Sequence, residues 1–415
     1  MKKSIIPLLL LVLTINATAQ KGEIKNIAIY LQKNAEILDF AGPMEVFIIA
    51  GFNVYTVAET TEPIRAMHAM TVIPDYSIDN APIPDIITFV GGGDLNDAKN
   101  PKLLKWTKKM ASNTELQFSV CTGAFFLAEA GLLDGMTATT FHSAIPILKQ
   151  GFSDIDVRND VRFVDNGNVI TTAGISAGID GAFHLVSKLK GTKYAQWVAD
   201  AMEYDKWVPN QGLVLTDDFS KEVMKKGFAE ALQNSNGRYL YNGELLDLAD
   251  KLEIQKEFKD AEKVITYVID RMAKPDLQTY EYLRNIYEIQ GKEVPPTSSE
   301  FLKILKTEGL KSAERLCQKT SKKFQKWVYL DLDEIFRIAY LDYYDKGDLK
   351  TAMGIAQLVH NLLPKDPYAN YVMGLYHERN GDLDKAMQLY KKSLDLDPNF
   401  YMAQEKIDSF DVRTK

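Results

Sequence analysis

Glu115-Leu116-Gln117-Phe118-Ser119-Val120-Cys121-Thr122-Gly123-Ala124-Phe125-Phe126-Leu127-Ala128 is the stretch that decides the fold. An apolar run leads into a single cysteine, and small residues then open an amphipathic helical pattern. This order predicts the strand, sharp turn and helix of a nucleophile elbow. Unpaired N–H groups and the helix dipole at such a turn favour a thiolate, so we expect Cys121 to be reactive and its pKa to be lowered. The alternative is a buried structural cysteine.

Strands alternate with helices on both sides of this stretch. The expected strands are 26–31, 53–58, 85–90, the run before Cys121, 138–140 and a hairpin turning at 165–168; the expected helices begin near Asp39, Leu103 and Ala177. This alternation predicts a parallel sheet with both faces covered, which binds ligands beyond the carboxyl ends of its strands. Cys121, the Gly91-Gly92-Gly93 loop and the loop before Asp39 should lie together at that edge.

Two features near this edge each have two interpretations. The three glycines after the third strand form either a tight strand-to-helix turn or, with the N–H of Thr122, a set of donors for a developing oxyanion. For the second role we consider the backbone of Gly92, Gly93 and Gly123. Asp39 either caps its helix or holds a proton against the thiolate and delivers it to a substrate.

These residues resemble the ThiJ/PfpI family of the class I glutamine amidotransferase-like superfamily. The resemblance rests on several motifs in order: residues 37–47, Gly91-Gly92-Gly93, Val120-Cys121-Thr122-Gly123-Ala124, 130–135, Ala138-Thr139-Thr140, 165–170 and 177–180. It covers residues 24–205, about half of the chain, and is strongest to the isonitrile hydratase-like branch. The resemblance implies a flavodoxin-like sandwich with a cysteine nucleophile at the elbow.

The resemblance also implies which residues act. Isonitrile hydratases carry an aspartate, a cysteine and a threonine at the positions of Asp39, Cys121 and Thr122, and all three are present here. The branch usually reads Thr-Thr-His-Trp after the elbow helix, whereas this chain reads Thr139-Thr140-Phe141-His142. A shift of one residue on a strand moves a side chain to the opposite face. His142 and Glu45 are therefore only further candidates for a group beside the thiol.

The second half of the chain is helical and repetitive. Gly381-Asp382-Leu383-Asp384-Lys385-Ala386 follows Gly347-Asp348-Leu349-Lys350-Thr351-Ala352 by 34 residues, which is the tetratricopeptide period. We predict an all-α domain over 213–412 with its clearest repeats at 333–399; a bundle without repeat geometry is the alternative. Its groove is expected to hold a protein or peptide, to pack on the first domain, or to form a homodimer contact.

The amino terminus predicts export. Lys2 and Lys3, an apolar run from Ile5 to Leu13 and Ala17-Thr18-Ala19 form a signal peptide over residues 1–20, cleaved near Ala19. We expect a bacterial periplasmic or secreted protein without a membrane span, because no later stretch is long and apolar enough. Cys121 and Cys317, the two cysteines, lie in different domains and are not expected to pair.

The composition narrows the class of function. The net charge is −7 and there is no basic run, so a nucleic-acid partner and transcriptional control are not expected. The five histidines show no metal-ligand spacing, and the sequence predicts neither a metal nor a cofactor. Three hypotheses remain: a cysteine-dependent hydratase or hydrolase of a small carbon–nitrogen compound, a protein that acts on reactive carbonyls or senses oxidants through Cys121, and a catalytically idle domain that serves as a scaffold through its repeats.

Overall fold

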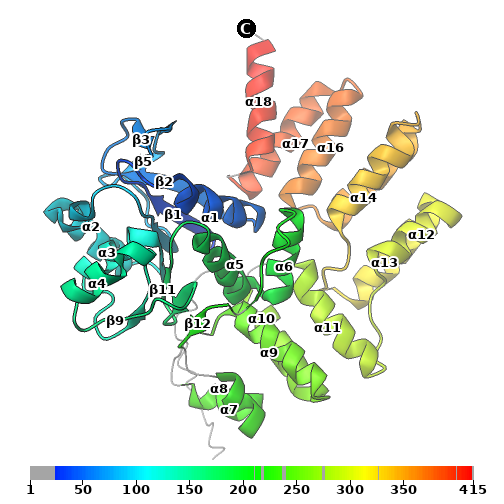
Figure 1. Cartoon of the computed structure of the whole chain (residues 1–415). Coiled ribbons are helices and arrows are strands. Elements are labelled where there is room, and N and C mark those ends of the chain that lie inside the picture. Colours follow the sequence, from blue (N-terminus) through cyan, green and yellow to red (C-terminus); the bar gives the residue numbers. More distant parts are fainter. Residues whose placement is uncertain are drawn as a thin grey trace, which may run out of the picture. The chain divides into compact units, whose positions relative to one another are not determined.

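The structure is a computed structural model that describes residues 24–209, 211–215, 219–235, 240–272, 276–325, 327–398 and 400–413. The expected signal peptide lies outside these residues. The chain divides into two compact units, with the break after Asp247 and a short return of residues 270–273 to the first unit. Figure 1 shows an α/β unit followed by paired helices.

The first unit contains the sheet. Its elements are β1 (Asn26–Tyr30), α1 (Ile37–Ile49), β2 (Asn53–Ala58), β3 (Ile64–Ala66), β4 (Met70–Val72), β5 (Tyr76–Ser77), β6 (Ile86–Phe89), α2 (Pro101–Ala111), β7 (Leu116–Val120), α3 (Ala124–Glu129), β8 (Thr137–Ala138), α4 (Ile145–Gly151), β9 (Asp156–Val157), β10 (Phe163–Asp165), β11 (Val169–Thr172), α5 (Ala177–Lys190), α6 (Thr192–Ala201), β12 (Leu213–Val214), α7 (Phe219–Lys226) and α8 (Phe228–Asn234).

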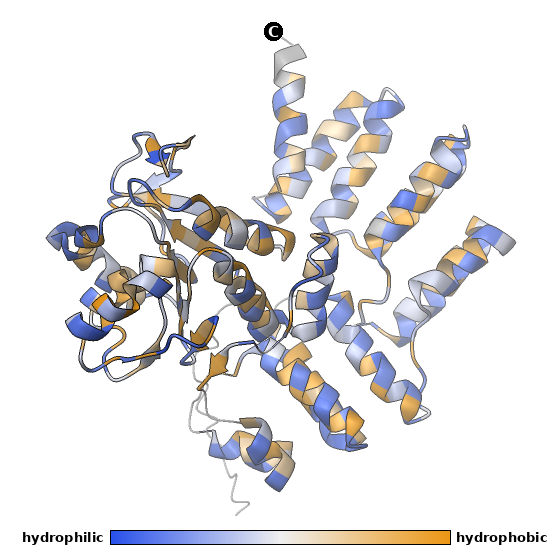
Figure 2. Cartoon of the chain, viewed as in Figure 1, coloured by the Kyte–Doolittle hydropathy of each residue, from blue (hydrophilic) through white to orange (hydrophobic). Residues whose placement is uncertain are grey.

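The main sheet has the strand order β12-β10-β11-β7-β6-β1-β2-β5, and its pairs are parallel except for the β10–β11 hairpin. Successive side chains of a strand point to opposite faces. On β1, Ile27 and Ile29 pack with α1, α5 and α6, whereas Ala28 and Tyr30 pack with α2, α3 and α4. Both faces are thus covered, and Figure 2 shows the strands as predominantly hydrophobic. The predicted flavodoxin-like sandwich is confirmed.

The first unit extends further along the chain than the change in composition near Leu213 predicts. β12 pairs with β10, and a buried ion-pair network holds the start of α9 (Asn242–Ile254) on α5. The ammonium of Lys188 lies 3.0 Å from carboxylate oxygens of both Asp165 and Glu244, and Asp247 accepts the backbone N–H of Thr192 at 2.8 Å. These contacts join residues distant in sequence, so the pattern of residue types could not place the boundary.

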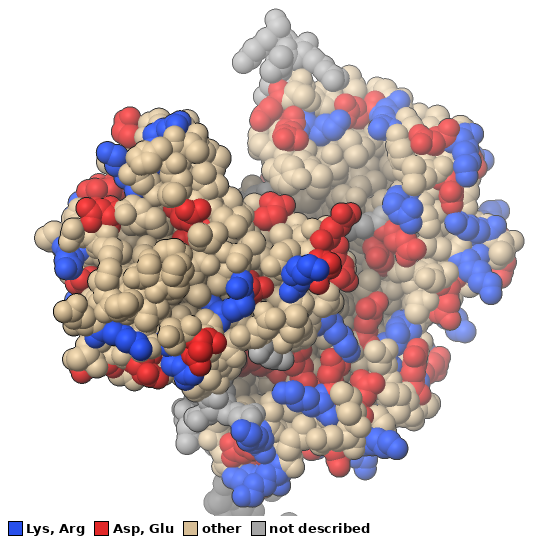
Figure 3. All heavy atoms as spheres, in the orientation of Figure 1, with Lys and Arg blue, Asp and Glu red and all other residues tan. Residues whose placement is uncertain are grey.

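The second unit is helical. It holds most of α9, then α10 (Phe258–Arg271), α11 (Leu277–Ile289), α12 (Ser298–Glu308), α13 (Leu310–Lys323), α14 (Leu332–Ile338), the π-helical segment η4 (Ala339–Tyr344), α15 (Leu349–Leu362), α16 (Pro367–Arg379), α17 (Leu383–Leu396) and α18 (Tyr401–Arg413). On the face in Figure 3, acidic and basic side chains intermingle over the surface. Among the described residues, no helix is long and apolar enough to cross a membrane.

The 34-residue period appears in the structure as a repeated turn. Gly347 and Gly381 have positive φ angles of 87° and 83°, and each precedes an aspartate that caps the next helix. Asp348 accepts the N–H of Thr351, and Asp382 accepts the N–H of Lys385. Inside the second repeat, a Cβ added to Gly374 would lie 2.5 Å from the ring of Tyr390, so only glycine permits this close packing of α16 on α17.

Candidate active site

Cys121 sits at the elbow that the sequence predicts. It follows β7 directly, opens a 3-10 turn (Cys121–Gly123) before α3, and has a positive φ of 58°. A positive φ is uncommon for a residue other than glycine and needs support from its surroundings. That support comes from its backbone: the N–H donates to Ala173 O at 3.2 Å, and the carbonyl accepts the hydroxyl of Thr140 at 2.7 Å.

Asp39 lies beside this cysteine, in the first turn of α1. Its carboxyl is fully buried and forms a side-chain hydrogen bond with the Cys121 thiol. Oδ2 accepts the N–H of Gly91 at 3.0 Å, and Oδ1 accepts the N–H of Ile175 at 3.0 Å. Asp39 is therefore not the cap of its helix, since residue 36 occupies that position and Asp39 bonds to two other loops.

Burial raises the pKa of Asp39 to about 6, although the hydrogen bonds from Cys121, Gly91 and Ile175 act in the opposite direction. Burial also raises the pKa of Cys121 to about 12, and the negative charge of Asp39 adds to this effect. Donors from Thr122 lower the pKa of Cys121 but do not offset burial. The pair therefore rests at neutral pH as a carboxylate that accepts a hydrogen bond from a protonated thiol.

The expectation of a lowered thiol pKa is thus wrong. It weighed the helix N-terminus alone, whereas α3 is only six residues long and the thiol is 5% exposed next to a carboxylate. Loss of hydration and like charge both disfavour the thiolate. Burial raises the pKa of Cys317 to about 12 as well, so pKa does not distinguish the two cysteines.

This state can be measured by alkylation. We expect iodoacetamide to label Cys121 slowly at pH 7 and about tenfold faster with each added pH unit up to pH 10, because only the thiolate reacts. Asp39→Asn removes the opposing charge, so it should accelerate labelling at a given pH. A plateau in the wild-type rate below pH 8 would show that the thiolate already predominates and would contradict this assignment.

The three glycines form a structural turn with little room around it. Gly92 has a φ of 84° and bridges to Ala35, and a Cβ on it would lie 2.4 Å from the backbone nitrogen of residue 36. The N–H of Gly92 donates to Thr122 Oγ1 at 3.2 Å, and that of Gly93 to Asn34 O at 3.0 Å. Two of the donors considered for an oxyanion, the N–H groups of Gly92 and Gly93, thus already have partners, which favours the tight-turn interpretation.

Gly91 and Gly123 have different steric roles. A Cβ on Gly91 would lie 2.7 Å from each of three atoms: Asp39 Oδ2, Cys121 Cβ and Thr122 N. Gly91 is therefore where the backbone approaches the acid and the thiol together. A Cβ on Gly123 would lie 2.1 Å from Phe89 O, so this glycine lets the elbow pack on β6.

The structure brings Asp39, Cys121 and Thr122 together, but not the two further candidates. Glu45 is exposed on α1, and His142 is exposed with its ring beside Phe141. Neither is among the main groups that shift the pKa of Cys121. Phe141 occupies the position where the isonitrile hydratase branch carries histidine, and its ring packs against Gly174.

Ile175 is a site residue that the sequence did not single out, whereas Gly91 and Thr140 appear there only as members of longer motifs. Ile175 is the least predictable, because it acts through a backbone N–H that any residue type except proline possesses. Its φ of 58° is unusual for a β-branched residue and directs that N–H to Asp39. Among the described residues, no three His, Cys, Asp or Glu side chains are grouped so as to hold a metal ion.

Comparisons with known proteins show what two parts of the chain are similar to. The DJ-1/PfpI family model matches residues 25–188, and a tetratricopeptide repeat model matches residues 367–400. The chain is 31% identical to isonitrile hydratase of Pseudomonas putida over 183 residues, which are 43% of this chain and 78% of that protein. It is 30% identical to the HTH-type transcriptional regulator CdhR of Pseudomonas aeruginosa over 149 residues, 36% of this chain and 44% of the regulator.

A solved ThiJ/PfpI family protein from Pseudomonas syringae has 26% sequence identity with a TM-score of 0.42, covering 59% of this chain and 91% of that one. The DJ-1/PfpI model and the similarity to isonitrile hydratase confirm the resemblance read from the sequence for the α/β unit, and the tetratricopeptide model confirms the predicted repeat. Through the domain that carries Asp39 and Cys121, the chain belongs to the DJ-1/PfpI family.

Proposed function

We propose that this protein is a cysteine-dependent enzyme that adds water to a small carbon–nitrogen compound, with isonitriles as the first substrate class to test. The observation that carries the proposal is the buried pair of Asp39 and Cys121, in which backbone N–H groups hold both carboxyl oxygens. An acid fixed in this way can take a proton from the thiol and return it to a substrate. The similarity to isonitrile hydratase supports the choice of substrate.

The proposed reaction starts from the protonated thiol. Asp39 takes the thiol proton as Cys121 sulfur bonds to the terminal isonitrile carbon, and then gives that proton to the same carbon, which leaves a thioimidate. Water adds to this carbon while the nitrogen gains a proton. The C–S bond then breaks, the sulfur recovers a proton, and an N-substituted formamide leaves. One isonitrile and one water are consumed for each formamide.

Thr122 supports the first step. Its backbone N–H and its hydroxyl both act on the sulfur in the direction that stabilises negative charge. Its Oγ1 also accepts the N–H of Gly92, which fixes the hydroxyl in place. We propose that Thr122 stabilises the sulfur as it loses its proton, and that His142 and Glu45 have no part in the chemistry.

A substrate screen tests the proposal. Isonitriles, small amides and reactive dicarbonyls are incubated with the wild type, with Cys121→Ala as the blank, and products are followed by NMR. We expect isonitriles alone to be converted, with formamide appearing in equal amount. Consumption of dicarbonyls instead would favour the reactive-carbonyl hypothesis.

A catalytically idle domain is the second candidate, and one observation favours it. Cys121 is almost fully buried and its pKa is raised. Both properties are expected of a cysteine that never reacts, as well as of a catalytic cysteine that waits for its substrate in the protonated state. In that case the repeats would carry the function through a protein or peptide partner. A screen without any Cys121-dependent turnover would support this candidate.

We also propose that the protein is exported and that its amino terminus is cleaved near Ala19. The basis is the Lys2-Lys3 start, the apolar run and the small residues before Gln20. Cell fractionation and N-terminal sequencing of the natural protein should find a periplasmic or secreted chain that starts near Gln20. A cytoplasmic protein that retains its first 19 residues would contradict this prediction.

A further inference from the structure

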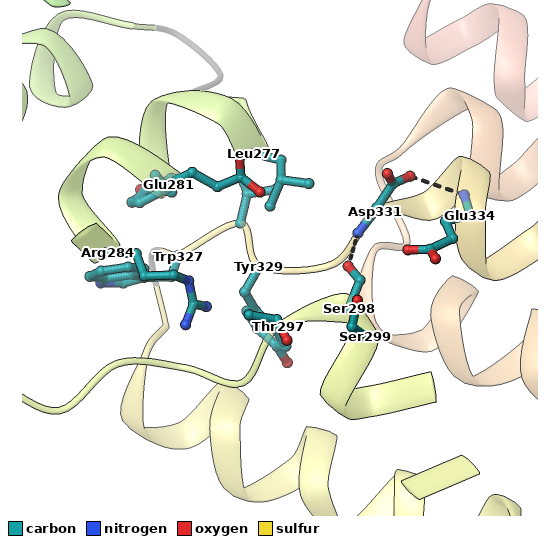
Figure 4. A pocket seen from close by; sticks show the side chains of 12 residues that line it. Leu277, Glu281, Arg284, Thr297, Ser298, Ser299, Trp327, Tyr329, Asp331 and Glu334 are labelled. Atoms are coloured by element: carbon teal, nitrogen blue, oxygen red, sulfur yellow. Dashed lines mark hydrogen bonds between the residues drawn. The ribbon is translucent and has the colours of Figure 1, made fainter. Parts of the chain in front are cut away.

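A cavity lies in the helical unit. Its volume is about 260 Å³, and Figure 4 shows its walls. The lining comes from α11, the start of α12, the segment before α14 and α14 itself. These helices lie outside the 367–400 repeat match, so the repeat pattern gives them no function.

One wall of the cavity is aromatic. The rings of Trp327 and Tyr280 stack with their centroids 5.3 Å apart and an interplanar angle of 28°. The ring of Tyr287 also packs against Trp327, with the ring centroids 5.6 Å apart, and helps to hold the indole in place. The faces of Trp and Tyr rings attract cations, and Trp does so most strongly.

The polar lining is predominantly acidic. Figure 4 shows Glu281 on one side of the cavity and Asp331 with Glu334 on the other. Asp331 caps α14 by accepting the N–H of Glu334 at 3.0 Å. In the part of the chain that the structure describes, the carboxylates of Glu281 and Glu334 form neither a hydrogen bond nor an ion pair with another side chain.

The one cationic side chain of the lining is engaged elsewhere. Arg284 lies 3.7 Å from Glu288 Oε1 and donates to Pro296 O at 3.3 Å. The Glu281 side chain is exposed, and partial loss of hydration raises its pKa; Arg284 lowers this pKa, and the nearby charges of Asp331 and Asp276 raise it. The cavity therefore holds more negative than positive charge, and a bound cation would relieve this excess.

We propose that this cavity binds an organic cation, specifically an alkylammonium or guanidinium group that packs on Trp327 and pairs with Glu281 and Glu334. The combination of an aromatic wall and facing carboxylates complements such a group in both its charge and its apolar stem. The volume lies just below the range for drug-sized ligands and suits one amine or one Lys or Arg side chain. The site does not depend on the reaction proposed for Cys121.

Isothermal titration calorimetry on the full chain tests this site. The probes are n-butylguanidinium and n-butylammonium, with neutral butyramide for comparison. We expect both cations to bind and butyramide not to bind. Glu281→Gln and Glu334→Gln should each weaken binding by roughly tenfold or more, because a charge-assisted hydrogen bond is lost. Glu308→Gln, which removes an exposed charge at the end of α12 outside the cavity, should leave binding unchanged.

Two further probes distinguish the sources of the cation. Acetyl-Gly-Lys-Gly-amide and acetyl-Gly-Arg-Gly-amide present the same groups on a peptide, and tighter binding than the free amines would assign the site to a protein segment. Weaker binding would assign it to a free amine. Absence of cation binding, equal binding of butyramide, or unchanged affinity in correctly folded Glu281→Gln and Glu334→Gln would overturn the proposal.

Discussion

Asp39→Asn is expected to lower kcat/KM for the substrate by about 100-fold or more, which is the typical contribution of a positioned acid–base group. Asparagine keeps the size of the side chain but neither accepts the thiol proton nor returns it. The same substitution should accelerate alkylation of Cys121, because the charge that opposes its ionisation is gone. A slower enzyme with a more reactive cysteine is a combination that simple misfolding would not produce.

Glu45→Gln is the matched control, since it removes a carboxylate from the same helix at an exposed position. Its kcat/KM should equal that of the wild type. Full activity in Asp39→Asn together with loss of activity in His142→Ala would show that the proton donor has been assigned wrongly.

Gly91→Ala is expected to cost about 100-fold in kcat/KM, since displacing a reacting group by about 1 Å has an effect of this size. The added methyl group would lie 2.7 Å from both Asp39 Oδ2 and Cys121 Cβ, so the two side chains must move apart. Asp39 cannot move away from the added methyl group without losing its hydrogen bond from the N–H of Gly91.

Gly151→Ala provides the control for this second substitution. A Cβ at Gly151 meets nothing within 4 Å, so the variant should keep the wild-type activity. Thermal unfolding of both variants separates a local effect from a global one. Wild-type turnover by Gly91→Ala would mean that the close contact between the acid, the thiol and this turn is not needed for catalysis.

Much of the fold could be predicted from the sequence because its signals are local. Apolar β-branched runs, the helical spacing after Cys121 and the turn at 165–168 each specify an element without reference to distant residues. The 34-residue period likewise fixed the capped turns at Gly347 and Gly381. The extent of the first unit was missed, because the Lys188 network joins residues more than fifty positions apart.

The sequence predicts which side chains form the candidate site, but not the direction in which the pKa of Cys121 shifts. The elbow pattern predicts Cys121, and the resemblance supports Asp39, Cys121 and Thr122 together, whereas Ile175 contributes only a backbone N–H. The direction of the Cys121 pKa shift depends on burial and on the distance to Asp39, and neither quantity is written in the local sequence. A helix N-terminus predicts a thiolate only where these two effects are small.

The pH dependence of kcat/KM, measured for the wild type and for Asp39→Asn, tests the central claim most directly. Asp39 must be ionised to take the thiol proton, and burial raises its pKa to about 6. Wild-type kcat/KM should therefore be low at pH 5, rise through pH 6 and level off above it, whereas the residual activity of Asp39→Asn should lack this limb. A wild-type profile that is flat from pH 5 to 8, or the same limb in the variant, would contradict the assignment of Asp39 as the group that exchanges a proton with Cys121.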